Sequence, residues 1–403
     1  MSMIIKESLE TQVTAVCDVL VCGGGFGGIS AALAAARQGK KVILLEKQYI
    51  LGGLGTAGLV TIYLPLCDGC GKQVSYGIAE ELFRLSISMG HEDRYPDNWL
   101  DQTDISRRTA KDKRFEVQYN PNLFAILAEQ LLLENGVQIL YGTYAVGVSM
   151  TDDRIDAVII ENKSGRQAIS ARSVVDATGD CDIAWFAGAP TETFRQGNIL
   201  AAWYYSLGRN GYDLNIVGCC DVPDSQKTAS NQVELLIPKR FAGLEGKELS
   251  EITQLSHVST LNHLQRKRKH DPSLVPTSIA TTPQVRMTRK IVGEYVLHDT
   301  EMHKEFPDSI GMVSDWRKRG PVYEVPFATL YSRQVRNLIT AGRCTSVTDS
   351  MWDIMRVIPC CAVTGQAAGT AAAMTDDFSA LDMEALQAEL EKNGVVLHEK
   401  DLK

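Results

Sequence analysis

Apolar and polar positions follow two different periods near the start of the chain. Residues 16–22 form a short apolar run that predicts a buried strand, and residues 29–38 are alanine-rich with helical spacing, ended by Gly39. Residues 41–46 predict a second strand. Strand, helix and strand together make a β-α-β unit of roughly 30 residues, which requires parallel neighbouring strands joined by a right-handed crossover.

The same patterns place further elements along the chain and divide it into two parts. Helices are predicted over 77–90, 121–134, 358–374 and 381–390, strands over 137–141, 173–177 and 337–342, and a hairpin over 144–150 and 155–162. The polar residues 91–114 predict a surface excursion, and residues 191–330 lack the β-α-β rhythm. We therefore expect an α/β fold: a parallel sheet with helices from 1–190 and 331–403, and a mainly antiparallel α+β cap or substrate domain from 191–330.

Composition and charge narrow the class of protein. The 403 residues are 44% hydrophobic and 22% charged, which is typical of a globular protein and excludes a disordered chain. With 41 basic and 49 acidic residues the net charge is −8, so nucleic acid is not an expected partner. The dense basic run at 266–270 is interpreted as a solvated helix end.

The apolar segments and the cysteines indicate a compartment. We find no run of about 18–20 apolar residues that would span a membrane, and the first ten residues do not form a secretory signal. The 10 cysteines of a chain without an export signal are expected to be reduced thiols in the cytoplasm.

A glycine-rich loop follows the first predicted strand directly. Gly23, Gly25 and Gly28 match the spacing G-x-G-x-x-G. The first glycine permits a tight turn, the second lets a pyrophosphate approach the backbone, and the third lets helix and strand pack closely. Glu46 ends the second strand, where a carboxylate can accept hydrogen bonds from a ribose diol. This pattern predicts a bound dinucleotide, and by itself it does not distinguish NAD from FAD.

Four later segments carry a resemblance to a known family. They read LLEK and GGLGTAG within 44–58, VVDATGD at 174–180, NLITAGRC at 337–344, and RVIP and TGQAAG within 356–369. Together with the glycine loop, they resemble the FAD-dependent oxidoreductase family of the glutathione-reductase-type flavoproteins. Fumarate reductase and succinate dehydrogenase flavoproteins are more distant relatives of that family.

The resemblance implies that FAD is the cofactor and that the parallel-sheet part is a Rossmann-like FAD-binding domain. Ala145 would offer its backbone to the adenine, and Gly342 would allow close approach to the ribityl and pyrophosphate region. The helix that starts at Ile358 would direct positive potential at the flavin ring. The implied cofactor-binding residues are Gly23, Gly24, Gly25, Phe26, Gly27, Gly28, Glu46, Lys47, Gly52, Gly53, Thr56, Ala57, Ala145, Ala177, Thr178, Gly179, Gly342, Arg343, Ile358 and Thr364.

The expected activity is hydride transfer between a small organic substrate and flavin N5, at the junction of the two domains. Arg286 and Arg356 are the strongest catalytic candidates, because a guanidinium there could bind a substrate carboxylate or carbonyl in bidentate fashion. Either arginine could instead form a structural ion pair with Asp180, Asp349 or Asp353. The third candidate, His257, is expected to be a partly buried structural histidine or a general acid or base. Arg195, Tyr204 and Tyr205 are weaker candidates.

Other functions stay open in the sequence. Cys67 and Cys70 form a C-x-x-C pair that could serve a thiol-linked flavoenzyme or be incidental loop cysteines, and a third reading is a non-catalytic FAD-binding sensor or assembly protein. No metal site is expected, since no ordered set of ligands accompanies this pair. A second glycine-rich β-α-β unit for NAD(P)H is not evident. The partners would be a small-molecule substrate and an electron acceptor or donor such as oxygen, a quinone or an NAD(P)H-linked protein, and the chain could form a homo-oligomer.

Overall fold

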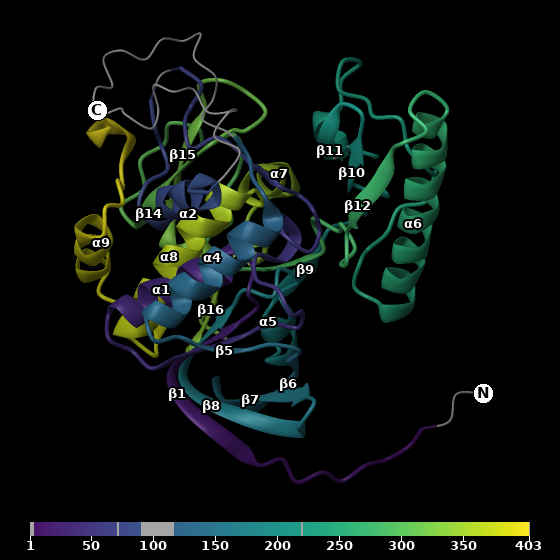
Figure 1. Cartoon of the computed structure of the whole chain (residues 1–403). Coiled ribbons are helices and arrows are strands. Elements are labelled where there is room, and N and C mark those ends of the chain that lie inside the picture. The colour runs from purple at the N-terminus through teal and green to yellow at the C-terminus, as the bar shows by residue number, and fades with distance from the viewer. Residues whose placement is uncertain (1–3, 71, 90–116, 219–220, 403) are drawn as a thin grey trace.

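The computed structural model describes residues 4–70, 72–89, 117–218 and 221–402. It has a larger body around a central sheet and a smaller lobe beside it (Figure 1). The predicted surface excursion at 91–114 lies outside the described residues. Among the described residues, none of the helices alone has the length and apolar character of a membrane span. The helices Asp349–Met355 and Ile358–Met374 have them only as a pair, and that pair is bent by 90°.

The central sheet has the strand order β5-β2-β1-β8-β7-β6, and β16 adds to β8. Its strands are β1 (Val13–Cys22), β2 (Val42–Leu45), β5 (Gln138–Leu140), β6 (Tyr144–Thr151), β7 (Arg154–Asn162), β8 (Gly165–Asp176) and β16 (Leu338–Thr340). β5, β2, β1, β8 and β16 run parallel, whereas β7 and β6 form an antiparallel hairpin on β8. The predicted α/β fold with a parallel sheet is therefore confirmed.

The parallel register brings three chain segments to one edge of the sheet. Cys22 and Thr340 both pair with Asp176, from opposite sides of β8. The carboxyl ends of parallel strands are where open α/β sheets bind their ligands. The loops that follow β1, β8 and β16 consequently emerge side by side, although they are more than a hundred residues apart in sequence.

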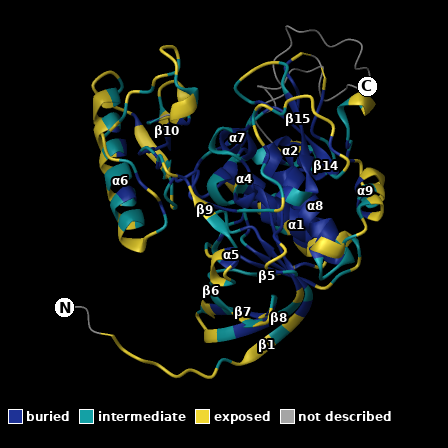
Figure 2. Ribbon diagram, turned by 180° about the vertical axis from the view of Figure 1, so that it is seen from behind, coloured by how far each residue is buried: buried dark blue, intermediate teal, exposed yellow. Residues whose placement is uncertain are grey.

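Helices α1 (Phe26–Arg37) and α8 (Ile358–Met374) pack against each other through small residues and form the most buried layer of the body (Figure 2). A Cβ added at Gly365 would lie 2.2 Å from the Gly27 carbonyl oxygen, and one at Gly369 would lie 2.0 Å from that of Ala31. α8 has the predicted bounds. α1 begins three residues earlier than predicted, because Gly27 and Gly28 are already part of the helix.

The remaining elements of the body surround this layer. They are α2 (Ile78–Ile87), α4 (Pro121–Glu134), α5 (Asp182–Phe186), α7 (Asp349–Met355) and α9 (Met383–Lys392), with the strand pairs β3 (Ile62–Tyr63) and β4 (Val117–Gln118), β9 (Thr191–Thr193) and β13 (Arg289–Ile291), and β14 (Ser309–Ser314) and β15 (Val322–Pro326). The main hydrophobic cluster includes Leu297, Val313 and Tyr323. Residues after about 286 therefore pack with the body.

The smaller lobe is a three-stranded antiparallel sheet covered by one long helix (Figure 1). It contains β10 (Tyr204–Gly208), β11 (Gly211–Asn215), β12 (Val275–Ile279) and α6 (Gly246–Arg268). Its own hydrophobic clusters include Tyr204 and Leu264 in one and Phe241 and Val285 in the other. The assignment of 191–330 to a cap domain stays a prediction, and the hydrophobic clusters divide near residue 286 instead of 330. The basic run 266–270 lies at the largely exposed end of α6, as predicted.

Hydrogen bonds fasten the smaller lobe to one segment of the body. The Thr281 backbone N–H donates to the Ala57 carbonyl at 2.8 Å, and the Gln284 side chain donates to that of Gly58. The Thr61 and Tyr205 hydroxyls lie 2.5 Å apart. The lobe is thus held against residues 57–61, which adjoin the cavity described next.

Candidate active site

A large cavity opens where the loops at the carboxyl edge of the sheet face the smaller lobe. Its volume is about 1980 Å³, including the solvent at its mouth. The body contributes the loops after β1, β2, β8 and β16, and the smaller lobe contributes Gly243, Leu249, Thr282, Pro283, Val285 and Arg286. The predicted site residues that line it are Gly23, Gly24, Gly25, Phe26, Gly27, Glu46, Lys47, Gly52, Gly53, Ala57, Ala145, Ala177, Thr178, Gly179, Arg286, Gly342, Arg343, Arg356 and Ile358.

Three predicted residues stand behind this wall and shape it. A Cβ added at Gly28 would lie 1.8 Å from the Gly23 carbonyl oxygen, so Gly28 sets the approach of α1 to the loop. The Thr56 hydroxyl donates to the Leu51 carbonyl. The Thr364 hydroxyl accepts a hydrogen bond from the Gly342 backbone N–H at 2.9 Å. These contacts hold the loops that reach the cavity.

His257 is placed differently from the prediction. It lies exposed on α6 and is not among the described residues that line the cavity. The prediction of partial burial was wrong, because α6 buries Ile252, Thr260 and Leu264 against the lobe and leaves His257 outside that set. The structure supplies no observation in favour of an acid or base role for it.

The glycine loop has the form that a diphosphate needs. Gly23 has φ +109°, and a Cβ there would lie 2.3 Å from the Ala177 carbonyl oxygen. A Cβ added at Gly25 meets no described atom within 4 Å, so the backbone is open toward the cavity at this point. No described side chain caps the start of α1, whose first N–H groups and positive dipole end can therefore bind an anion. The loop thus fits the diphosphate of FAD.

Glu46 joins this loop to the end of β2. Its Oε2 accepts from the Gly24 N–H at 2.8 Å and its Oε1 accepts from the Gln48 N–H at 2.7 Å. Burial raises the pKa of Glu46 above its usual range. A carboxylate has about four acceptor sites. Glu46 can therefore position both loops and still accept hydrogen bonds from a ribose.

We expect the affinity for FAD to fall as Glu46 becomes protonated. Ribose hydroxyls donate to the ionised carboxylate, so affinity should decrease as the pH is lowered from above the raised pKa of this group to below it. Glu46→Gln should bind FAD roughly 10-fold more weakly at the higher pH, since hydrogen bonds to charged groups contribute ~1.5–3 kcal/mol. FAD fluorescence quenching at a series of pH values measures both effects.

The control for this experiment is Asp182, which also lines the cavity. Burial raises the pKa of Asp182 to about 6, even though Arg289 lies 2.7 Å away. Asp182→Asn separates the titration of that group from the titration of Glu46. If the FAD affinity of Glu46→Gln fell with decreasing pH as steeply as that of the wild type, the assignment of the ribose to Glu46 would be contradicted.

Charged residues connect the cofactor loops to the smaller lobe. Arg343 donates to the carbonyl oxygens of Val285 at 3.0 Å and Arg286 at 2.8 Å, and it lies 3.4 Å from Asp180. This arginine therefore ties the loop after β16 to the segment that carries Arg286. Asp180 and Asp182 line the cavity and were not predicted to do so, although they directly follow the strand predicted at 173–177.

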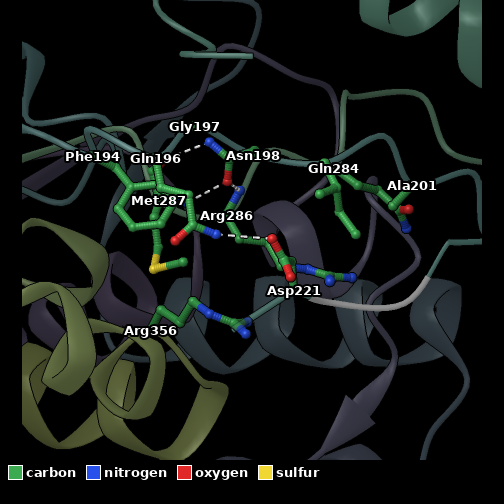
Figure 3. A pocket seen from close by; sticks show the side chains of 11 residues that line it. Phe194, Gln196, Gly197, Asn198, Ala201, Asp221, Gln284, Arg286, Met287 and Arg356 are labelled. Carbon is green, nitrogen blue, oxygen red and sulfur yellow. Dashed lines mark hydrogen bonds between the residues drawn. The ribbon is translucent and has the colours of Figure 1, made fainter. Parts of the chain in front are cut away.

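A second, smaller cavity adjoins the first (Figure 3). Its volume is about 350 Å³, again including open solvent, and Arg286 and Arg356 line both cavities. Asn198, also on this wall, holds the neighbouring backbone: its Oδ1 accepts from the N–H groups of Arg286 at 3.1 Å and Met287 at 3.0 Å. The two arginines thus lie where the two cavities meet.

Arg356 is held by a buried carboxylate. Asp353, which is 0% exposed, accepts from Nε of Arg356 at 3.0 Å and from Nη2 at 2.5 Å. Of the three structural ion pairs anticipated from the sequence, the structure shows this one for Arg356. Asp353 also lies 3.3 Å from Arg317. The guanidinium of Arg286 lies over the Trp203 ring, 4.9 Å from its centroid.

Comparisons with known proteins agree with this geometry. A family model described as FAD dependent oxidoreductase matches residues 18–204 and 203–390. Thioredoxin reductase from Ureaplasma parvum serovar 3 is 32% identical over 77 residues, 19% of this chain and 25% of that protein. Glutathione reductase from Schizosaccharomyces pombe is 27% identical over 170 residues, 41% of this chain and 32% of that protein. The chain thus spans about a quarter to a third of the length of these curated relatives.

One solved structure aligns with most of this chain. The geranylgeranyl bacteriochlorophyll reductase-like protein from Thermoplasma acidophilum aligns with a TM-score of 0.44 and 15% identity. The alignment covers 94% of this chain and 82% of that one.

Among the described residues, no group of three or more His, Cys, Asp or Glu side chains could hold a metal ion.

Proposed function

Because the chain belongs to the FAD-dependent oxidoreductase family, we propose that it transfers a hydride between a small organic substrate and flavin N5. The proposed substrate site is the wall formed by Arg286 and Arg356. The observation that carries this proposal is that both arginines line the large cavity and the smaller one beside it. FAD supplies the two-electron chemistry when it is bound, and the protein supplies binding and orientation.

The arginines suit the binding of a carboxylate or carbonyl oxygen. A guanidinium has five N–H donors and stays protonated, so it stabilises negative charge and does not act as a base. Two of the donor nitrogens of Arg356 face Asp353, which fixes the orientation of the planar group. Such a preorganised donor stabilises charge that develops on the substrate oxygen.

An anaerobic substrate screen tests the proposal. Purified FAD-loaded protein is mixed with small organic acids, ketones and alcohols, with NADH and NADPH as parallel donors, and the visible flavin absorbance is followed. The proposal predicts that at least one organic substrate bleaches the oxidised protein or restores colour to the reduced protein. If no compound does either, the protein is a non-catalytic FAD-binding sensor or assembly protein.

The thiol-linked alternative has less support. Cys67 is 2% exposed within the main hydrophobic cluster and Cys70 is exposed, and neither is among the described residues that line the two cavities. Cys361 does line the large cavity, but burial raises the pKa of its thiol to about 12. It therefore stays a poorly nucleophilic thiol at neutral pH.

We expect the double variant Cys67→Ala, Cys70→Ser to keep the turnover of the wild type. Alanine replaces the buried cysteine because both are small and apolar, so the cluster around Cys67 stays packed. Turnover and bound FAD are measured on the same preparation. Loss of turnover with full FAD content would instead assign the redox step to this thiol pair.

A further inference from the structure

Part of the large cavity remains after the predicted cofactor-binding residues are set aside, and a group of aliphatic side chains lines one side of this part. The body and the smaller lobe both contribute to it. The aliphatic residues are Val60, Ile62, Leu64, Leu249, Val285 and Val357. The cavity therefore has an apolar face between the two lobes, and all of its residues except Val357 lie outside the glycine loop and the other predicted FAD segments.

The segment around β3 shows how this face arises. Val60, Ile62 and Leu64 are half-buried, whereas Thr61 and Tyr63 are fully buried. Successive side chains of an extended strand point to opposite sides, so the even-numbered residues face the cavity together. They leave apolar surface inside a concave site, and such surface marks a place where an apolar ligand binds.

The two arginines lie next to this face in the chain. Val285 precedes Arg286 and Val357 follows Arg356, and all four residues line the large cavity. Of the neighbouring amides, Gln284 uses its Oε1 to accept from the Trp203 N–H and its Nε2 to donate to the Gly58 carbonyl. A second polar group on a ligand would find few partners on the aliphatic face, and burying it there would cost free energy.

We propose that the substrate is an apolar monocarboxylate. Its carboxylate binds the guanidiniums of Arg286 and Arg356, and its hydrocarbon body covers the aliphatic face formed by Val60, Ile62, Leu64, Leu249, Val285 and Val357. This inference rests on the proposed function, which places the substrate at the arginine wall. It adds the chemical class of the molecule that binds there.

Isothermal titration of the FAD-loaded protein with butanoate, hexanoate and octanoate tests the class without any need for turnover. Each added methylene should tighten binding about fourfold, since burying one stabilises a complex by ~0.8 kcal/mol. Hexanamide, which lacks the charge, should bind roughly 10-fold more weakly than hexanoate, as should succinate, whose second carboxylate meets the aliphatic face. Equal affinities along the series, or hexanamide binding as well as hexanoate, would overturn the inference.

Two matched variants locate the effect. Ile62→Ser should weaken octanoate binding at least fourfold and leave butanoate binding nearly unchanged, because it removes apolar contact from the hydrocarbon body. Val258→Ser is the control, since Val258 is 55% exposed on α6 and is not among the described residues that line either cavity. Equal loss of octanoate affinity in both variants would contradict the placement of the ligand.

The inference and the proposed function can fail separately. Tight, length-dependent binding of carboxylates without flavin reduction by any compound in the screen would overturn hydride transfer and support the binding class. Flavin reduction by a small polar substrate, with flat affinities along the carboxylate series, would overturn the binding class and support hydride transfer. In that second case the aliphatic face would be covered by the cofactor.

Discussion

Replacing Gly28 by alanine is expected to abolish FAD binding and to give colourless protein. The new Cβ would lie 1.8 Å from the Gly23 carbonyl oxygen and 3.3 Å from the Ala177 side chain. The first of these atoms is backbone, so either α1 or the glycine loop must move. Overpacking of this kind costs about 1–3 kcal/mol. The displacement also turns the N–H groups at the start of α1 away from the diphosphate. FAD released by denaturation, counted per chain, measures the outcome.

Two other glycines serve as comparisons for this variant. Gly246→Ala adds a methyl group at the first residue of α6, where no described atom lies within 4 Å, so FAD content should match the wild type. Gly25→Ala also meets no described atom, but its methyl group enters the space that we assign to the diphosphate. It should fold normally and bind FAD more weakly. Wild-type FAD content in Gly28→Ala would contradict the role of the loop.

The double variant Arg286→Ala, Arg356→Ala should slow substrate-dependent flavin reduction by a factor of ~10²–10³. Losses of this size are found when a preorganised donor that stabilises developing charge is removed. FAD content should stay close to that of the wild type, because the glycine loop and Glu46 are unchanged. Anaerobic stopped-flow measurement of flavin bleaching, with the substrate found in the screen, gives the rate.

Asp349→Asn is the matched control for the arginine variants. This variant removes one carboxylate from α7, the helix that also carries Asp353. Asp349 is only partly buried. Flavin reduction in this variant should match the wild type. The proposal for the arginine wall would be contradicted if Arg286→Ala and Arg356→Ala each reduced the flavin at the wild-type rate and with the wild-type KM.

Elements with clear local signals could be predicted to the residue. The helix at 121–134 begins where Asn120 accepts hydrogen bonds from the N–H groups of residues 122 and 123, and Pro121 fills its first position. β8 was predicted only at 173–177 and in fact starts at Gly165. Its first half pairs with β7 and is partly exposed, so it lacks the continuous apolar run of its second half.

Most of the residues that we expect to bind the cofactor could also be predicted from the sequence. Glycine spacing predicted the loop at 23–28, the family resemblance implied the other segments, and most of the residues predicted to hold FAD line the cavity. The choice of Asp353 as the partner of Arg356 follows from a spacing of three residues at the end of a helix, which brings the two side chains together.

The two arginines of the proposed substrate site were predicted, but the aliphatic face beside them could not be, because it depends on contacts between the lobes. Leu249 comes from α6 and Val60 from the loop before β3, and no pattern in the sequence relates them. The division of the hydrophobic clusters near residue 286 could not be predicted either, because it also depends on tertiary contacts. Residues 287–330 lack the β-α-β rhythm, yet they pack into the core of the body.

The position of FAD in a crystal structure of the purified protein tests the central claim most directly. We predict that its diphosphate lies against residues 23–28 at the start of α1 and that its ring reaches the wall formed by Arg286 and Arg356. A ring bound away from both arginines, or a diphosphate bound elsewhere than at this loop, would contradict the account.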